Sequence, residues 1–195
     1  MSTTRTSKTR ILVEGALMIA LATVLSYLKF FELPQGGTIS IEMLPLVLMG
    51  LRNGPKWGCF TGFVHGLLQM IIGFQNVMYC ATLLSQIGCI LLDYLIAFTV
   101  LGVAPIIARL FKNPYVGVTA GAVVAGLLRF GCSFLSGILL YGSYAPEGTP
   151  VWIYSLVYNG SYMIPDILLL AVVILILRKV APKFFNAPRK QAAAA

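Results

Sequence analysis

The chain has 195 residues, of which 58% are hydrophobic and only 10% are charged, and its mean hydropathy is +0.89. Soluble proteins carry about 25% charged residues, so this composition excludes a soluble globule, a disordered chain and a coiled coil. Fourteen Lys and Arg against six Asp and Glu give a net charge of +8. We expect an all-α integral membrane protein, because long apolar runs in lipid must satisfy their backbone groups internally.

Six apolar runs follow a short basic head. In chain order they cover residues 11–31, 39–51, 57–72, 79–107, 115–141 and 151–177. A helix needs about 20 residues to cross the hydrocarbon core, so we expect the short second run to be tilted, half-inserted or extended into the preceding loop. The prediction is a cytoplasmic basic N-terminus (1–10), a domain of six transmembrane helices (11–180) and a cytoplasmic tail (181–195).

The basic residues predict the orientation of these helices. If the N-terminus is inside, twelve of the fourteen Lys and Arg fall on inner segments, whereas the outer loops hold Glu32 and Glu147. This distribution is the positive-inside pattern, and it explains the net charge without nucleic acid. We therefore expect both termini in the cytoplasm.

The cysteines and the single histidine lack the spacing of a metal site. Cys59, Cys80, Cys89 and Cys132 lie inside apolar runs without a CxxC pair, and His65 is the only histidine. This pattern excludes a zinc site of the usual spacing and a disulfide framework, so we expect buried, reduced thiols. The sequence has no GxxxxGK[ST] loop. We expect no cofactor in this chain, and an ATP-driven transporter would take its motor from another subunit.

Ionisable side chains at membrane depth are costly and are functional candidates by default. Asp93 lies at the centre of the fourth run and Arg129 near the centre of the fifth. Either they form a buried ion pair that fixes helix register, or Asp93 faces a cavity and meets a cationic or donor-rich ligand. Asp166 follows Pro165, where a kink would free backbone groups for its carboxylate to satisfy. Glu42, near the outer end of the second run, either lines an entrance or extends toward water.

The fifth run carries a mixed polar face. Arg129, Ser133, Gly137 and Tyr141 recur every four residues and therefore share one side of a helix. This face suits a flat ligand lying along the helix, and it equally suits close packing against another helix.

The last run begins with aromatic residues and one carboxamide. Trp152, Tyr154, Tyr158 and Tyr162 either form an aromatic belt at the membrane interface or line a site. Asn159 offers the donors and acceptors that the edge of a heterocycle requires.

On the third run, His65 and Gln69 are spaced i, i+4, which predicts a mutual hydrogen bond within the packing. His65 also allows a remote alternative function, an intramembrane serine hydrolase with Ser133 or Ser136 as nucleophile. Such a nucleophile needs a base within hydrogen-bond reach, and His65 is the candidate.

Three segments together resemble a known family: ELPQGGTISIEMLPLVLMGLRNG, LLDYLIAF and LLRFGCSFLSGILLYGSYAPEGTPVWIYSLVYNGSYM. In order and over nearly the whole chain, they are similar to the thiamine-specific substrate-binding (S) components of energy-coupling factor (ECF) transporters. The resemblance implies a non-enzymatic subunit in a prokaryotic plasma membrane that binds thiamine from the outside. Its partners would be one transmembrane coupling subunit and two cytoplasmic ATPases.

The same resemblance implies particular site residues. The predicted thiamine-binding residues are Thr38, Asp93, Tyr94, Ser133, Gly137, Tyr141, Tyr154 and Asn159. The glycine-rich outer loop of residues 35–40 would lie over this site, and the AxxxA pattern of Ala16 and Ala20 would dock on the coupling subunit. Family members place a stacking histidine where this chain has Ser133, and tryptophans where it has Tyr141 and Thr38. Another vitamin or a pyrimidine precursor is therefore the alternative ligand.

Overall fold

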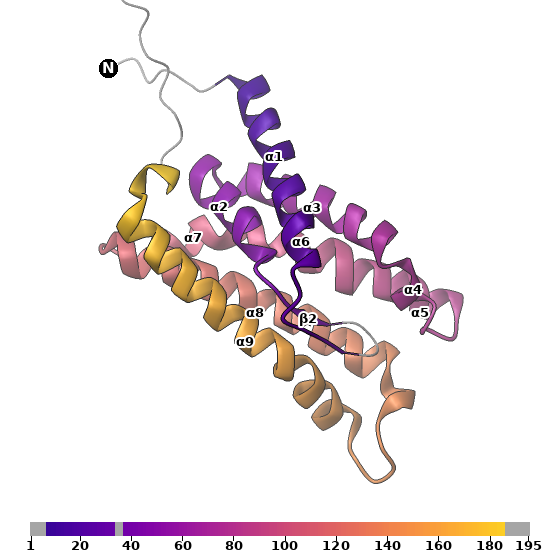
Figure 1. The fold of residues 1–195 in the computed structure, drawn as a ribbon. Coiled ribbons are helices and arrows are strands. Elements are labelled where there is room, and N and C mark those ends of the chain that lie inside the picture. The colour runs from indigo at the N-terminus through magenta and orange to yellow at the C-terminus, as the bar shows by residue number, and fades with distance from the viewer. Residues whose placement is uncertain (1–6, 34–36, 186–195) are drawn as a thin grey trace, which may run out of the picture.

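A computed structural model describes residues 7–33 and 37–185, which fold almost entirely into helices (Figure 1). The first helix, α1 (Lys8–Tyr27), leads through a two-stranded hairpin, β1 (Phe31–Glu32) and β2 (Thr38–Ile39), to the short α2 (Met43–Asn53). Next come α3 (Pro55–Ile72) and one turn of helix, α4 (Phe74–Val77). The chain ends in two long helices, α8 (Pro114–Leu140) and α9 (Val151–Val180), separated by the 3₁₀ turn η3 (Gly142–Tyr144), and in the 3₁₀ turn η4 (Pro182–Phe185).

The segment between α4 and α8 is a continuous helical stretch, Leu83–Ala108, whose pitch changes along its length. It consists of α5 (Leu83–Cys89), the π-helix η1 (Ile90–Ile96), α6 (Ala97–Thr99), the 3₁₀-helix η2 (Val100–Val103) and α7 (Ala104–Ala108). π-Helical turns are rare and occur frequently at functional sites. The one in this chain contains Asp93 and Tyr94.

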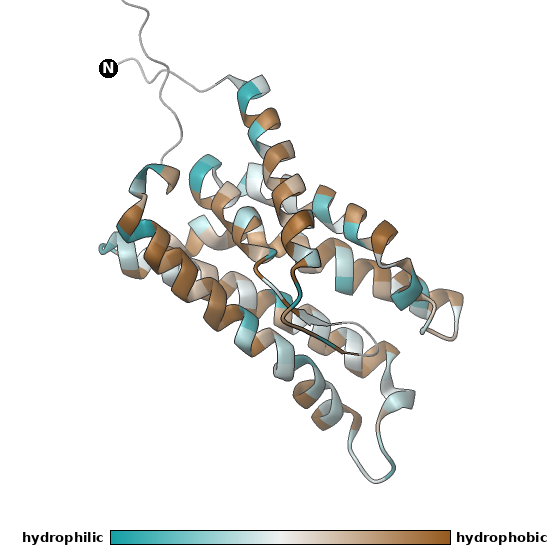
Figure 2. Ribbon diagram, in the orientation of Figure 1, coloured by the Kyte–Doolittle hydropathy of each residue, from teal (hydrophilic) through white to brown (hydrophobic). Residues whose placement is uncertain are grey.

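The predicted all-α membrane class is confirmed, but the number of spans is not. By length and composition, four described helices can cross a membrane: Lys8–Tyr27, Leu83–Ala108, Pro114–Leu140 and Val151–Val180. Large apolar side chains on these helices point outward, as with Leu84, Leu139 and Leu168, which is the arrangement expected where the surrounding solvent is lipid. Figure 2 shows hydrophobic residues along much of the length of the long helices, interrupted by hydrophilic residues.

Two predicted boundaries are wrong, and the hairpin is the reason. The first run was expected to stay helical to residue 31 and the second to begin at residue 39. Instead Phe31 pairs with Ile39 and Glu32 with Thr38 in an antiparallel register. The second helix therefore begins only at Met43, which makes it still shorter than the sequence predicts.

Glycines along one face of α3 let this helix approach the helical stretch Leu83–Ala108 closely. A Cβ atom on Gly66 would lie 2.6 Å from the carbonyl oxygen of Tyr94, and one on Gly58 would lie 2.9 Å from Cα of Gly102. Small residues one helical turn apart permit such contact between backbones. This packing sets the position of the segment that carries Asp93.

Arg52, near the end of α2, connects three elements. Its side chain forms an ion pair with Glu14 of α1 and donates hydrogen bonds to the carbonyl oxygens of Lys183 and Phe184 at 3.2 and 3.1 Å. The first half of α1, the end of α2 and η4 are therefore held together by one side chain.

Candidate functional site

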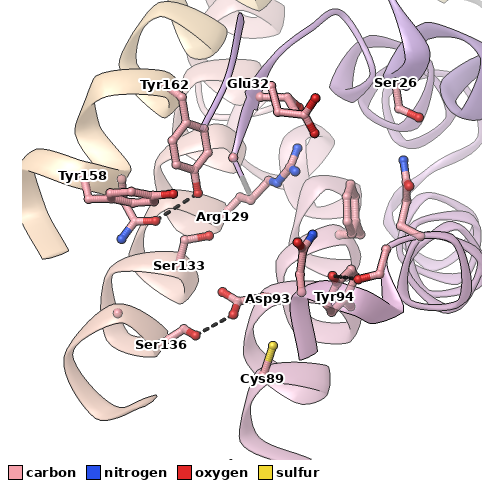
Figure 3. Close-up of a pocket in the computed structure, with 18 of the residues that line it drawn as sticks. Ser26, Glu32, Cys89, Asp93, Tyr94, Arg129, Ser133, Ser136, Tyr158 and Tyr162 are labelled. Carbon is pink, nitrogen blue, oxygen red and sulfur yellow. Dashed lines mark hydrogen bonds between the residues drawn. The ribbon is translucent and has the colours of Figure 1, made fainter. Parts of the chain in front are cut away.

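A cavity of about 240 Å³ lies between the hairpin, α3, η1, α8 and α9 (Figure 3). Every residue predicted from the family resemblance to bind the ligand lines this cavity: Thr38, Asp93, Tyr94, Ser133, Gly137, Tyr141, Tyr154 and Asn159. They come from four elements, β2, η1, α8 and α9, and from the position directly after α8, which Tyr141 occupies. That they contact a ligand stays a prediction; the structure places them around one cavity.

Asp93 projects from η1 into this cavity, where a hydroxyl group holds it (Figure 3). Ser136 of α8 donates a hydrogen bond of 2.5 Å to its Oδ2 atom. On the same side, Cys89 Sγ lies 3.3 Å from the Tyr141 hydroxyl group, which also donates to the carbonyl oxygen of Asn76. Asp93 is thus oriented by a neutral donor and keeps its negative charge facing the cavity.

The ion pair considered between Asp93 and Arg129 does not form. Arg129 Nη2 lies 2.7 Å from Glu42 Oε1, and Gln69 Nε2 donates to the other carboxylate oxygen of Glu42 at 2.9 Å. The guanidinium group also lies over the Phe98 ring, 4.2 Å from its centroid. Glu42 precedes α2 and is buried, so it lines the cavity rather than extending toward water.

Asn159 is held by contacts on both sides of its carboxamide. Its Nδ2 atom donates to the carbonyl oxygen and to Oγ of Ser155 at 3.0 and 3.2 Å, and its Oδ1 atom accepts from the Tyr162 hydroxyl group at 2.9 Å. Ser155 in turn donates to the carbonyl oxygen of Phe134 at 2.7 Å. The amide is therefore fixed in one orientation between α8 and α9.

The polar face predicted on the fifth run is confirmed as a single face: Arg129, Ser133, Gly137 and Tyr141 all line the cavity. The four aromatic residues at the start of the last run neither all form an aromatic belt nor all line the site. Tyr154, Tyr158 and Tyr162 line the cavity, whereas Trp152 is 54% exposed. Only Trp152 has the placement expected of a belt residue.

The hairpin forms one side of the cavity. Gly37 and Thr38 line it, and Gly37 has a φ of +93°, with the Tyr162 ring so close that a Cβ atom would lie 2.6 Å from it. Residues 35 and 36 of the predicted loop lie outside the described residues. The backbone N–H group of Ser40 donates to Asp166 Oδ1 at 2.9 Å. Asp166 therefore accepts a hydrogen bond from the backbone next to the hairpin, and not from backbone groups of α9 freed by Pro165 as the sequence predicted.

His65 does not bond to Gln69, because Gln69 is engaged by Glu42. The imidazole is fully buried, packs edge-on against Phe98 at 4.9 Å between ring centroids, and has no hydrogen-bond partner among the described residues. Ser136, for its part, is bonded to Asp93. The serine–base arrangement of a hydrolase is absent from the part of the chain that the structure describes.

The remaining candidates are placed as follows. Ala16 and Ala20 lie on the exposed side of α1. All four cysteines are free, but only Cys80 and Cys89 are buried, so the expectation of fully buried thiols is wrong for Cys59 and Cys132. Within residues 7–33 and 37–185, no cluster of three or more His, Cys, Asp or Glu side chains could hold a metal ion.

Several cavity residues were not predicted as ligand contacts. Ser136 and Tyr162 are the clearest cases, since they hold Asp93 and Asn159 in place. Both follow the helical period: Ser136 is seven residues after Arg129, and Tyr162 is three after Asn159. Extending the i, i+3, i+4, i+7 pattern along each face would have found them.

Comparison with known proteins gives consistent results. A family model described as thiamine transporter protein matches residues 12–186. The thiamine transporter ThiT of Bacillus subtilis (strain 168) is 36% identical over 189 residues, covering 91% of this chain and 95% of that protein. The solved structure of ThiT from Listeria monocytogenes superposes with a TM-score of 0.76 at 26% identity, over 92% of this chain and 98% of that one.

A second solved structure, the S component of a bacterial ECF transporter, shares the fold with a TM-score of 0.62 at 17% identity, over 91% of this chain and 98% of that chain. The relatives are bacterial and the long helices are membrane-capable, so the chain is a prokaryotic membrane protein. The match over almost its whole length shows that it belongs to the thiamine transporter protein family.

Proposed function

We propose that this chain is the substrate-binding component of an ECF transporter and that it captures thiamine from the extracellular side of the plasma membrane. The observation that carries the proposal is Asp93, a carboxylate that faces the cavity with no Lys or Arg of the described residues within ion-pair distance. A carboxylate at membrane depth without a cationic partner is costly, and a cationic ligand would balance it. The family to which the chain belongs supports the choice of thiamine.

The chemistry of thiamine agrees with the lining of the cavity. Its thiazolium ring is a permanent cation, for which a carboxylate and the faces of Tyr141, Tyr154 and Tyr158 are suitable partners. Its aminopyrimidine ring presents a donor and acceptors along one edge. We assign this edge to Asp93 and Asn159, which line the cavity and offer a carboxylate and a carboxamide to it.

Transport requires energy that this chain does not supply. We propose that a coupling subunit docks on the exposed face of α1 around Ala16 and Ala20, and that two ATPase subunits drive reorientation of the whole chain so that the cavity opens inward. ATP would then be used only by the partners. The small side chains permit the close approach that such docking needs.

Binding of the purified protein to thiamine, hydroxymethylpyrimidine, riboflavin and pyridoxine, measured by isothermal titration calorimetry, tests the ligand. We expect thiamine to bind most tightly and to raise the midpoint of thermal unfolding, since a ligand at 100 times its Kd stabilises a protein by about 2.7 kcal/mol. If another vitamin binds more tightly than thiamine, that vitamin is the ligand of this fold and the assignment of thiamine is wrong. Native mass spectrometry of the purified protein gives an independent check, because a retained ligand is weighed directly.

A further inference from the structure

The charged residues that line the cavity form two ion pairs and leave one carboxylate outside them. The charged side chains of the described lining are Lys29, Glu32, Glu42, Asp93 and Arg129. Lys29 Nζ lies 2.7 Å from Glu32 Oε1, and Arg129 Nη2 lies 2.7 Å from Glu42 Oε1. With both pairs neutral, the lining carries one uncompensated negative charge, on Asp93.

The two pairs differ in how far water screens them. The side chains of Lys29 and Glu32 are 36% and 55% exposed, whereas those of Arg129 and Glu42 are 13% and 6% exposed. Exposed pairs contribute little, but removal of one partner from a buried pair leaves an uncompensated charge in a poorly solvated place. The charge balance of the cavity is therefore sensitive to Glu42 in a way that it is not to Glu32.

Arg129 is also placed so that its charge would reach the cavity if Glu42 were absent. It lines the cavity beside Asp93 (Figure 3), and its Nη1 atom is buried without a hydrogen-bond partner among the described residues. Its other neighbours include the face of the Phe98 ring and the carboxylate of Asp166, which interacts with it electrostatically. A guanidinium group released from Glu42 would repel a cationic ligand and attract the carboxylate of Asp93.

We propose that Glu42 determines the charge preference of this cavity: by pairing with Arg129, it leaves Asp93 as the single uncompensated charge and so selects a singly charged cation over a neutral ligand of the same shape. Glu42 acts through Arg129 and does not need to touch the ligand. The inference rests on the proposed function, because it concerns how the same cavity recognises a thiazolium ring.

The test compares thiamine with a neutral isostere in which a thiophene ring replaces the thiazolium. Kd values for both are measured by calorimetry on the purified full chain, and the readout is the ratio of the isostere Kd to the thiamine Kd. In Glu42→Gln we expect this ratio to fall by about tenfold or more, because like charges brought together in a desolvated site are strongly unfavourable. In Arg129→Gln, which leaves two negative charges, the ratio should stay the same or rise.

The double variant Glu42→Gln/Arg129→Gln separates charge from structure, since it lacks the ion pair but keeps one net negative charge. Its ratio should return to within about threefold of the wild-type value, as expected when the two effects are coupled. The matched control is Glu14→Gln, which breaks the similarly buried Glu14–Arg52 pair outside the cavity and should leave the ratio unchanged.

The outcomes distinguish the two proposals. The inference is wrong, and the pair has only a structural role, if both single variants shift the ratio in the same direction. The same conclusion follows if the ratio of the double variant is as low as that of Glu42→Gln. If Glu42→Gln does not fold, the Arg129→Gln and double variants still decide, because a clear fall of the ratio in either of them would overturn the inference. If the wild-type protein itself does not bind thiamine, the proposed function fails, whatever the variants show.

Discussion

The Ser136 hydroxyl group donates a 2.5 Å hydrogen bond to Asp93, joining the C-terminal part of α8 to the π-helix η1. The acceptor is the carboxylate that we assign to the ligand, so the bond fixes the direction in which its charge points. Hydrogen bonds to charged groups contribute about 1.5–3 kcal/mol. Positioning of Asp93 thus depends on a second residue that carries no charge of its own.

Replacement of Asp93 by Asn should weaken thiamine binding by about 100-fold or more, since a desolvated charge pair costs several kcal/mol to break. The neutral thiophene isostere should lose less affinity, because it loses only the contact of its pyrimidine ring with the carboxylate and has no cationic ring for the charge to attract. Calorimetry with both ligands gives the comparison. Near-native thiamine affinity in Asp93→Asn would contradict the placement of the site.

Replacement of Ser136 by Ala should weaken thiamine binding by about tenfold, which corresponds to the lower end of the value of a hydrogen bond to a charged group. The effect should vanish in the Asp93→Asn background, because the two residues act as one unit. A double-mutant cycle measured by calorimetry checks this coupling. Additive losses would mean that Ser136 contacts the ligand independently of Asp93.

Replacement of Asn159 by Ala should weaken thiamine binding strongly and should also release two neighbours. Its amide holds Ser155 on one side and the Tyr162 hydroxyl group on the other, and an unsatisfied buried group costs about 1–3 kcal/mol. We therefore expect a lower unfolding midpoint together with the lost affinity. Tyr162→Phe is the comparison variant: it removes one of these bonds and should show a smaller loss in both measurements.

Ala16→Trp should abolish thiamine uptake by cells while the purified protein still binds thiamine normally. Ala16 lies on the exposed side of α1 and does not line the cavity, so a large side chain there blocks a partner rather than the ligand. The control is Val116→Trp, on an exposed position of α8, which should keep both binding and uptake. Normal uptake by Ala16→Trp would place the docking face elsewhere.

Gly66→Ala should destabilise the protein by about 1–3 kcal/mol, the usual cost of overpacking, because its Cβ atom would meet the carbonyl oxygen of Tyr94 at 2.6 Å. Gly131→Ala is the matched control in α8, where no atom lies within 4 Å of the added methyl group, and alanine favours a helix by up to about 1 kcal/mol. Thermal unfolding monitored in detergent should therefore move in opposite directions for the two variants. An unchanged midpoint in Gly66→Ala would show that α3 can move away.

Much of the architecture follows from local pattern. Apolar runs predict the long helices to within a few residues at most ends, and a four-residue period places Arg129, Ser133, Gly137 and Tyr141 on one face. Where the sequence prediction fails, a contact distant in sequence is responsible. The hairpin shortens the second helix through pairing of Phe31 with Ile39, and Asp166 bonds to Ser40, which is 126 residues away.

By itself, the sequence determined that the protein is helical, that it lies in a membrane and which residue types on each helix are too polar for lipid, because composition and periodicity are properties of neighbouring residues. Only the tertiary structure decided which polar groups meet. The sequence offered Asp93 as the candidate partner of Arg129, and the packing of α2 against α3 and α8 assigned Arg129 to Glu42 instead. That choice, made by geometry between segments 87 residues apart, is what leaves Asp93 to face the cavity with its charge unbalanced.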